Sequence, residues 1–270
     1  MTADHFPSDE QPADQPVLVA IDERVATITL NRPAARNALS SEMLRLLPQV
    51  LAAADADPLV DVLILTGSDP AFCAGLDLNE LGSSAGKLAA TGADGGRASG
   101  ARGPLPRLHK PLIGAVNGVA VTGGLELALN CDFLVASEHA KFGDTHTRVG
   151  VMPAWGMTVL LPQAIGIRRA REMSFSGNFM SADEALDWGL VNHVVPHAEL
   201  LSFTRTLALD IAANDRDAVR QIRSTYAEIA HDDDAWEQEQ RDSRAWLRTQ
   251  FSPDQVAARR AAIQARGRSQ

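Results

Sequence analysis

Two short glycine-bearing stretches contain the residue types that are best suited to chemistry. They are residues 71–78 (AFCAGLDL) and, about fifty residues later, residues 123–127 (GGLEL). Each is an apolar, strand-like run that ends in small residues and then opens a helical pattern, so each leaves backbone N–H groups unpaired at the beginning of a helix. Two such helix beginnings can together form an oxyanion hole, in which amide donors stabilise a negatively charged oxygen.

The glycines in these stretches are predicted to position the donors. Gly75 permits a tight turn with φ above zero, so that the next amide, that of Leu76, points into a cleft. Gly123 and Gly124 are predicted to adopt the same kind of turn, and they carry no side chain that would block a ligand. Glu126 follows Gly123 by about one helical turn, near enough to serve as an acid or a base. Either stretch alone is more typical of an ordinary strand-to-helix turn, but the pair favours a site.

A series of further motifs occurs in a fixed order between residues 17 and 196. They are residues 30–33 (LNRP) with 37–39 (NAL), 71–78, 110–118 (KPLIGAVNG), 123–132, 141–143 (KFG), 150–153 (GVMP) and 189–192 (GLVN). A single motif of this kind is weak, but the ordered series is very specific. On these motifs the chain resembles the enoyl-CoA hydratase/isomerase (crotonase) family.

The resemblance implies an α/β fold, a crotonase-type spiral core of ββα turns followed by a C-terminal helical trimerisation region. We therefore predict a disordered N-terminal tail over residues 1–16, a crotonase-like core domain over 17–196 and a C-terminal helical region over 197–270. The residues themselves also favour an α/β domain, because β-rich apolar runs alternate with helical patterns. The predicted strands are residues 17–21, 25–30, 62–66, 112–116 and 133–136.

The same resemblance implies which residues bind an acyl-CoA thioester. The amides of Leu76 and Gly123 would hold the thioester oxygen, and Glu126 matches one of the family's two catalytic glutamates. The coenzyme A part is expected to lie against four residues: Arg36, Ala38, Ala74 and Leu76. Arg36 suits a phosphate because its planar guanidinium donates in a fork, although an exposed, solvated arginine is the alternative. No separate cofactor is expected, since coenzyme A is part of the substrate.

The family's second catalytic glutamate is absent. The hydratase pattern there is Phe-Gly-x-Pro-Glu, whereas residues 142–150 of this chain read FGDTHTRVG and place His146 where the glutamate would be. A lone histidine is usually structural, but Asp144 could orient this imidazole if the segment is extended, because alternate side chains of a strand share a face. If His146 is a proton donor, its titration near neutrality should alter the pH profile. A catalytic and a structural role both stay open.

The predicted function is that of an enoyl-CoA hydratase, a lyase that adds water across the 2,3 double bond. Glu126 would activate water for addition at C3, while His146, or the water's own proton through Glu126, serves C2. One alternative is double-bond isomerisation, which needs only one base, although similar isomerases tend to keep the missing glutamate. Another is an acyl-CoA-binding protein that has lost turnover, but the retained Glu126 favours an enzyme.

Composition bounds these hypotheses. The length of 270 residues suits one large domain, and a net charge of −9 argues against a nucleic-acid surface. No apolar run approaches a membrane span, and the N-terminus has no signal-peptide core, which predicts a cytoplasmic protein without membrane contact. Cys73 and Cys131 have neither metal-site nor disulfide spacing, so no metal is predicted and both are expected to fill the core. A Cys73–His146 nucleophile pair is the less favoured alternative.

Three further stretches carry expectations about surfaces and the pocket. Residues 83–103, rich in glycine, alanine and serine, should be mobile and border the acyl pocket, either ordering on ligand binding or forming a plain flexible insert. After residue 199 the chain is helical, and an apolar stripe needs a partner, which we expect from other subunits of a homotrimer or a dimer of trimers. That stripe comprises Leu200, Phe203, Leu207 and Ile211. The arginines at 259, 260, 266 and 268 are expected to form a solvated helix face.

Two departures from the family pattern concern the binding pocket. Asn79 stands where a lysine usually follows the first glycine stretch, which puts one phosphate contact in doubt. Met152, Trp155 and Met157 stand where smaller residues are common, so we expect the pocket to be reshaped.

Overall fold

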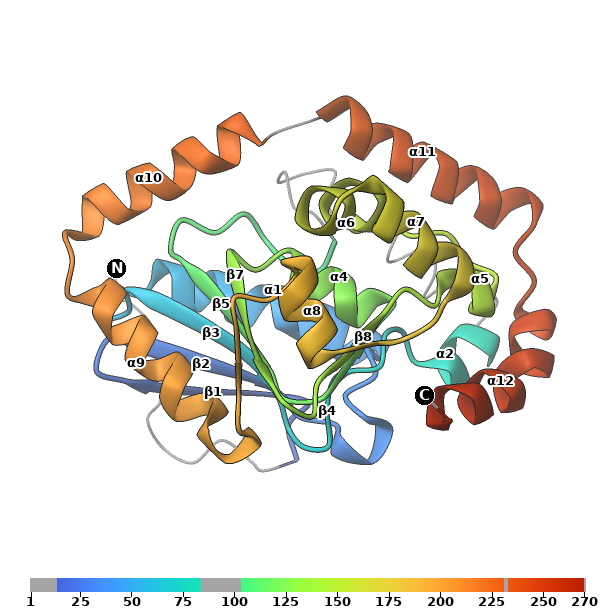
Figure 1. The fold of residues 1–270 in the computed structure, drawn as a ribbon, viewed down its shortest axis with the longest axis horizontal. Coiled ribbons are helices and arrows are strands. Elements are labelled where there is room, and N and C mark those ends of the chain that lie inside the picture. The colour runs from blue at the N-terminus through green and yellow to red at the C-terminus, as the bar shows by residue number, and fades with distance from the viewer. Residues whose placement is uncertain (1–13, 84–102, 231–232, 270) are drawn as a thin grey trace.

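Two β-sheets form the centre of the protein in the computed structural model, which describes residues 14–83, 103–230 and 233–269 (Figure 1). The larger sheet contains, in spatial order, β1 (Val17–Asp22), β2 (Val25–Leu30), β3 (Val62–Gly67), β5 (Leu112–Val116), β7 (Phe133–Ser137) and β10 (His193–Val195). The smaller sheet contains β4 (Ala71–Cys73), β6 (Val119–Val121), β8 (Lys141–Gly143) and β9 (Met180–Ser181). β1 and β9 are antiparallel to their neighbours, and the other pairs are parallel.

A strand–strand–helix unit repeats three times and links the two sheets. The units are β3-β4-α2, β5-β6-α4 and β7-β8-α5, with α2 at Leu78–Ser83, α4 at Gly123–Leu129 and α5 at His146–Val149. This repeat confirms the predicted spiral of ββα turns. Because β4, β6 and β8 are parallel neighbours, the helices that follow them begin at the same edge of the small sheet.

The five predicted strands are confirmed, and three of them end one residue later than predicted. The first long helix, α1 (Ser41–Ala56), begins where the Ser40 side chain accepts a hydrogen bond from the Met43 amide at 3.2 Å. At its other end the buried Lys110 ammonium donates to the carbonyls of Ala54 and Asp57 at 2.9 and 2.6 Å. A sequence-distant lysine thus satisfies carbonyls that the end of a helix leaves unpaired.

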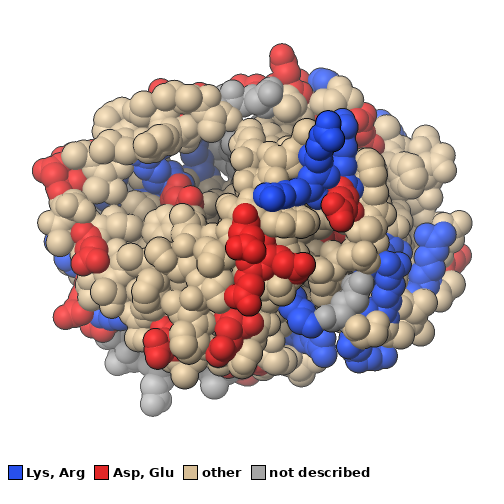
Figure 2. Space-filling model, viewed as in Figure 1, with Lys and Arg blue, Asp and Glu red and all other residues tan. Residues whose placement is uncertain are grey.

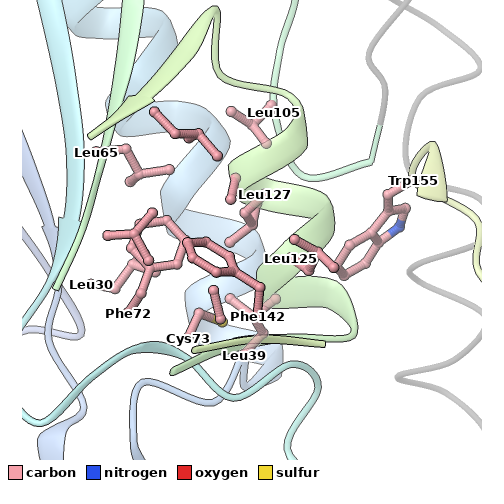
Figure 3. Packing of buried hydrophobic residues seen from close by; sticks show 14 of the residues in the cluster. Leu30, Leu39, Leu65, Phe72, Cys73, Leu105, Leu125, Leu127, Phe142 and Trp155 are labelled. Carbon is pink, nitrogen blue, oxygen red and sulfur yellow. The ribbon is translucent and has the colours of Figure 1, made fainter. Parts of the chain in front are cut away.

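The main core fills the space between the sheets, α1 and α4 (Figure 3). Phe72 and Phe142 face one another there with Leu125 and Leu127 beside them, and all four side chains are fully buried. Cys73 lies in the same cluster, where burial raises the pKa of its thiol to about 12 despite a hydrogen bond from the Gly75 backbone. The thiol therefore stays protonated at neutral pH, which supports core filling and not a nucleophile.

Further helices surround this core, together with short 3₁₀ turns at η1 (Pro33–Ala35) and η2 (His197–Glu199). They are α6 (Met157–Ile165), α7 (Ile167–Ser176), α8 (Ala182–Trp188), α9 (Leu200–Ala212), α10 (Arg216–Ile229), α11 (Asp233–Thr249) and α12 (Pro253–Arg268). Acidic side chains gather over α8, whereas basic side chains gather over α7 and α12 (Figure 2).

The apolar stripe on α9 has a partner within the chain, which corrects our expectation that another subunit covers it. Leu200 and Ala208 are buried against the outer face of the large sheet, with Phe203, Leu207 and Ile211 packed around them. Their partners on the sheet include Val62, Ile64 and Ile113. Among the described residues, exposed large apolar side chains occur on several helices, with Phe175 on α7, Leu201 on α9 itself, and Ile222, Tyr226 and Ile229 on α10.

The last two helices return to the core of the same chain. α11 contacts α6, and α12 contacts α2 and α5 (Figure 1). The predicted tail over residues 1–16 and the stretch 83–103 lie almost entirely outside the described residues. No helix within the described ranges is long and apolar enough to cross a bilayer.

Candidate active site

A cavity of about 500 Å³ lies where the helices that follow the small sheet begin. Side chains from η1, α2, α4, α5, α11 and α12 line it. Every residue that the sequence analysis placed in direct contact with the substrate lines this one cavity: Arg36, Ala38, Ala74, Leu76, Gly123, Glu126 and His146. The fold therefore brings together residues that span about 110 positions of the sequence.

Two backbone amides at the cavity have no acceptor among the residues that the structure describes. Within the described ranges, neither the Leu76 nor the Gly123 N–H donates to a protein oxygen, although both residues line the cavity. Gly75 has φ +82°, which allows the turn that we predicted before Leu76. An amide that is left unpaired at a cavity wall is available to a ligand oxygen.

The conformation around Gly123 differs from the prediction. The positive φ falls on Thr122, at +54°, and not on the two glycines that follow. Close approach explains the glycines instead. A Cβ on Gly124 would lie 2.1 Å from the Cys73 carbonyl oxygen, and a Cβ on Gly123 would lie 2.8 Å from the Trp155 ring.

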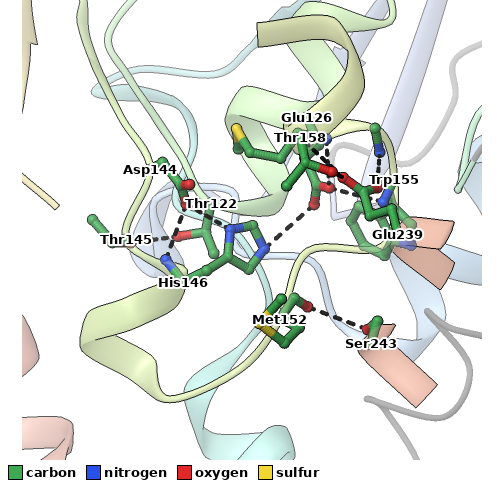
Figure 4. Close-up of polar contacts among 12 residues, drawn as sticks. Thr122, Glu126, Asp144, Thr145, His146, Met152, Trp155, Thr158, Glu239 and Ser243 are labelled. Carbon is green, nitrogen blue, oxygen red and sulfur yellow. Dashed lines mark hydrogen bonds and ion pairs between the residues drawn. The ribbon is translucent and has the colours of Figure 1, made fainter. Parts of the chain in front are cut away.

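Glu126 is buried in the first turn of α4, with 2% of its surface exposed. Its Oε1 accepts hydrogen bonds from the amides of Trp155 and Met157 at 2.8 and 3.3 Å. Its Oε2 lies 3.5 Å from Nε2 of His146 (Figure 4). The two oxygens therefore have different surroundings, because one is held by the backbone and the other faces an imidazole.

His146 lies between two carboxylates. Its Nδ1 is 2.7 Å from Oδ1 of Asp144, which also accepts from the His146 amide at 3.1 Å (Figure 4). The segment is not extended, as our argument for this contact assumed, because His146 is the first residue of α5. Asp144 reaches it by folding its side chain back onto the beginning of that helix, as aspartates commonly do in turns.

The surroundings of His146 set its charge. Burial alone would lower the pKa of the imidazole, but the negative charge and hydrogen bond of Asp144, with those of Glu126, raise that pKa to about 10. The charge of His146 in turn keeps the pKa of Asp144 below its usual value, even though burial would raise it. His146 is therefore an imidazolium at neutral pH, and we do not expect the titration near neutrality that an ordinary histidine shows.

The predicted coenzyme A residues lie together at the cavity. The Ala74 amide donates to the Arg36 carbonyl at 3.1 Å, and the exposed Arg36 adopts a left-handed conformation with φ +51°. The side chain of Asp77 caps the turn that precedes α2, because it accepts a hydrogen bond from the Asn79 amide at 2.9 Å. The same carboxylate forms an ion pair with Arg32 at 3.0 Å.

The C-terminal helices contribute residues that the sequence did not suggest. Cavity-lining residues from α11 and α12 are Ser243, Leu247, Ile263, Gln264, Gly267 and Arg268. Arg268 is exposed, as expected for a solvated arginine face, although it also lines the cavity, whereas Arg260 is half-buried. Arg260 donates to the side chain of Asn79, so a cation stands beside the position where a lysine was expected. No local pattern signals these contacts, because they depend on how α12 packs against α2.

Two of the three large side chains that the sequence analysis placed at the pocket line the cavity. Met152 and Trp155 line it, whereas Met157 is fully buried in the core behind it. Trp155 is 4% exposed, and its ring lies against Gly123. In the part of the chain that the structure describes, no three histidine, cysteine or acidic side chains are grouped so that they could hold a metal ion.

Comparison with known proteins gives a consistent result. A family model described as enoyl-CoA hydratase/isomerase matches residues 20–262. A probable peroxisomal enoyl-CoA hydratase 1 of Arabidopsis thaliana is 42% identical over 207 residues, which are 74% of this chain and 74% of that protein. A 2,3-dehydroadipyl-CoA hydratase of Escherichia coli K12 is 42% identical over 196 residues, which are 73% of this chain and 75% of that protein. The crystal structure of an enoyl-CoA hydratase from Mycobacterium tuberculosis H37Rv aligns with a TM-score of 0.78 and 46% identity, covering 87% of this chain and 99% of that one.

Proposed function

The chain belongs to the enoyl-CoA hydratase/isomerase family, and on that premise we propose that it adds water across the 2,3 double bond of an enoyl-CoA thioester. The observation that carries this proposal is the buried row of Asp144, His146 and Glu126, which lies beside the same cavity as two unpaired amides. A base, a proton donor and an oxyanion site are the three elements that hydration of a conjugated thioester needs.

The amides of Leu76 and Gly123 act as the oxyanion hole. As water adds at C3, negative charge moves onto the thioester oxygen, and two fixed N–H donors stabilise that charge without reorganisation. In other enzymes a single donor of this kind lowers the activation barrier by about 3 to 4 kcal/mol.

Glu126 is the general base. Its Oε2 takes a proton from the attacking water while the water oxygen forms a bond to C3. The hydrogen bonds from Trp155 and Met157 hold Oε1, so the carboxylate cannot rotate freely and Oε2 keeps its direction.

His146 takes the place of the missing second glutamate and donates the proton to C2. Its raised pKa means that it carries this proton at neutral pH. After donation the neutral imidazole regains a proton from Glu126 across the 3.5 Å contact, so one water is added and both side chains return to their initial states. Asp144 orients the ring and stabilises its positive charge.

The coenzyme A part of the substrate lies against Arg36, Ala38, Ala74 and Leu76. Two alanines leave room for the thioester arm at the cavity, and the exposed Arg36 is placed to donate to a phosphate. Arg268 adds a second positive charge at the cavity wall.

A panel of thioesters tests this function. Purified protein is incubated with 2-enoyl-CoA and 3-enoyl-CoA substrates of several chain lengths, and hydration and isomerisation are followed together. We expect hydration of 2-enoyl-CoA. Isomerisation of 3-enoyl-CoA without hydration would identify an isomerase instead, and tight binding without any turnover would identify an acyl-CoA-binding protein.

A further inference from the structure

One face of α11 holds the chain segment that connects α5 to α6. Four side chains at helical spacing make up this face: Trp236, Glu239, Ser243 and Trp246. Trp246 donates to the Gly150 carbonyl at 2.9 Å, and Ser243 donates to that of Met152 at 3.4 Å. At the far end, the Trp236 ring packs so closely on Gly156 that a Cβ there would lie 2.2 Å from it.

Glu239 is the charged member of this face, and it is 5% exposed. Its Oε1 accepts from the Gly156 amide at 2.7 Å. Its Oε2 accepts from the Thr158 amide at 2.6 Å and from the Thr158 hydroxyl (Figure 4). The carboxylate thus satisfies amides at the beginning of α6, where the helix itself provides no acceptor.

Between them, Glu126 and Glu239 accept hydrogen bonds from four consecutive residues, which we call the 155–158 segment: Trp155, Gly156, Met157 and Thr158. The amides of the first and third donate to Glu126, and those of the second and fourth donate to Glu239. The alternation places the segment between the two carboxylates. A shift of its backbone away from Glu239 would therefore also change the hydrogen bonds that hold Glu126.

We propose that Glu239 is a positioning residue: it fixes the 155–158 segment so that the Trp155 and Met157 amides hold Oε1 of Glu126 and direct Oε2 toward His146 and the substrate water. This inference rests on the proposed hydratase function. It assigns a role in the site to a residue of the C-terminal helical region, about 110 positions from Glu126 in the sequence.

The electrostatics of the pair favour a role beyond capping a helix. Burial raises the pKa of Glu239, and the negative charge of Glu126 raises it further, although the hydrogen bonds from Thr158 and Gly156 oppose both effects. A neutral serine or asparagine can cap a helix without placing a second buried carboxylate near the first. A carboxylate, however, has two oxygens that can accept from Gly156 and Thr158 at the same time.

The variant Glu239→Gln tests the inference with little change in volume. Glutamine has one acceptor oxygen, and its amide group would face an N–H donor, so part of the 155–158 segment loses its partner. We expect kcat for hydration to fall about 10- to 100-fold, because small displacements of a catalytic group have effects of this size. The dissociation constant for acetyl-CoA, which has no double bond to hydrate, should stay within about 2-fold of the wild-type value, since Glu239 lies behind the segment and not at the ligand.

Glu237→Gln is the matched control. This glutamate lies on the same helix, is exposed and pairs with Arg241 at 3.2 Å. Its replacement removes the same charge from α11 without touching the 155–158 segment, so kcat should not change. An equal loss of kcat in both variants would attribute the effect to the net charge of α11 and overturn the inference.

A double-mutant cycle separates positioning from general stabilisation. If Glu239 acts through Glu126, Glu239→Gln should reduce kcat strongly in the wild type and by less than about 2-fold in a Glu126→Gln background. A residue that only stabilises the fold would reduce kcat by the same factor in both backgrounds. That additive result would overturn the inference.

Amide hydrogen exchange gives a measurement that does not depend on turnover. Glu239→Gln should speed exchange in the 155–158 segment relative to Glu237→Gln, and unchanged exchange would overturn the inference even if the wild type hydrates no thioester. Absence of hydration by the wild type would by itself overturn only the proposed function. If Glu239→Gln does not fold, Thr158→Val removes the hydroxyl donor alone, and a several-fold loss of kcat, absent in the Glu126→Gln background, is the expected result.

Discussion

The two oxygens of Glu126 have different surroundings, and the proposed mechanism uses one of them as the base. Oε1 accepts two backbone amides, and Oε2 faces His146 at 3.5 Å. Glutamine keeps the shape and reach of this side chain but does not take a proton from water. We therefore expect Glu126→Gln to reduce hydration by roughly 100-fold or more while acyl-CoA affinity stays near that of the wild type. Steady-state kinetics and calorimetry measure the two quantities, and near-normal turnover would exclude Glu126 as the base.

The raised pKa of His146 predicts how the stability of the protein depends on pH. Its pKa is raised from 6.5 to about 10 in the folded protein, so its contribution to stability is complete below about pH 6.5 and is lost as the pH rises through about 10. The free energy of unfolding should therefore decrease over this pH range more in the wild type than in His146→Gln. Denaturant titrations across the range measure the difference. Parallel pH profiles would mean that the imidazole is not held as a cation.

The positive charge of His146 also leads to a prediction about the activity of its variants. His146→Ala should reduce hydration by an amount comparable to Glu126→Gln if the imidazolium donates the proton to C2, and by less if it only orders water. In the first case the wild type should keep the donor protonated through neutral pH, because the pKa lies near 10. This corrects the expectation of a neutral titration that the residue type alone suggested.

Trp155 should limit the length of the acyl chain that the cavity accepts. Its ring lies against Gly123 and lines the cavity, so Trp155→Ala should enlarge the space beside the oxyanion site while leaving the backbone amide in place. We expect kcat/KM for long-chain relative to four-carbon enoyl-CoA to rise at least several-fold. Removing a buried tryptophan costs about 3 to 5 kcal/mol of stability, so Trp155→Phe is the milder companion. An unchanged ratio in folded variants would place the end of the acyl chain elsewhere.

At the scale of elements, the proposed oxyanion site consists of the Gly123 amide, at the beginning of α4, and the Leu76 amide, two residues before α2 begins. Gly123 is the first residue of α4, a position where proline fits a helix but has no N–H. Gly123→Pro should reduce hydration by about 100- to 1,000-fold, the usual effect of removing one oxyanion donor. Because a ring there would press on Trp155, circular dichroism must first show a folded protein. Normal turnover in that folded variant would remove the Gly123 amide from the mechanism.

Local patterns predicted five of the six strands of the large sheet because the causes of these strands are local. The alternating apolar runs identified β2, β3, β5 and β7, and the small residues before Leu76 indicated a turn that Gly75 makes with positive φ. The conformation of Thr122 was not predictable in this way. Its positive φ occurs two residues before Gly124, which approaches the Cys73 carbonyl closely in a contact between segments about fifty residues apart.

At the scale of the whole molecule, α10 leads us to expect an oligomer. Tyr226 is 71% exposed, and Ile222 and Ile229 are exposed beside it on the same helix, which is unusual for a surface that only meets water. We expect a trimer or a dimer of trimers, and Ile222→Asp with Tyr226→Asp should dissociate it. Sedimentation velocity of both proteins measures this, with Asp217→Asn on the same helix as a control. A wild-type monomer at micromolar concentration would contradict the expectation.

The sequence by itself determined the α/β class, five strands of the large sheet and the two glycine-bearing helix beginnings, because strand periodicity and turn glycines are properties of neighbouring residues. The spiral of ββα units and the residues that converge on the cavity followed from the resemblance of the ordered motifs to a known family. Only the tertiary structure decided that His146 is charged, since its pKa depends on two carboxylates that fold around it. Tertiary packing also decided that α9 covers the protein's own sheet and that Glu239 lies behind Glu126. Contacts between segments more than a hundred residues apart leave no periodic trace in the chain, so burial and charge at such places can be known only after the chain has folded.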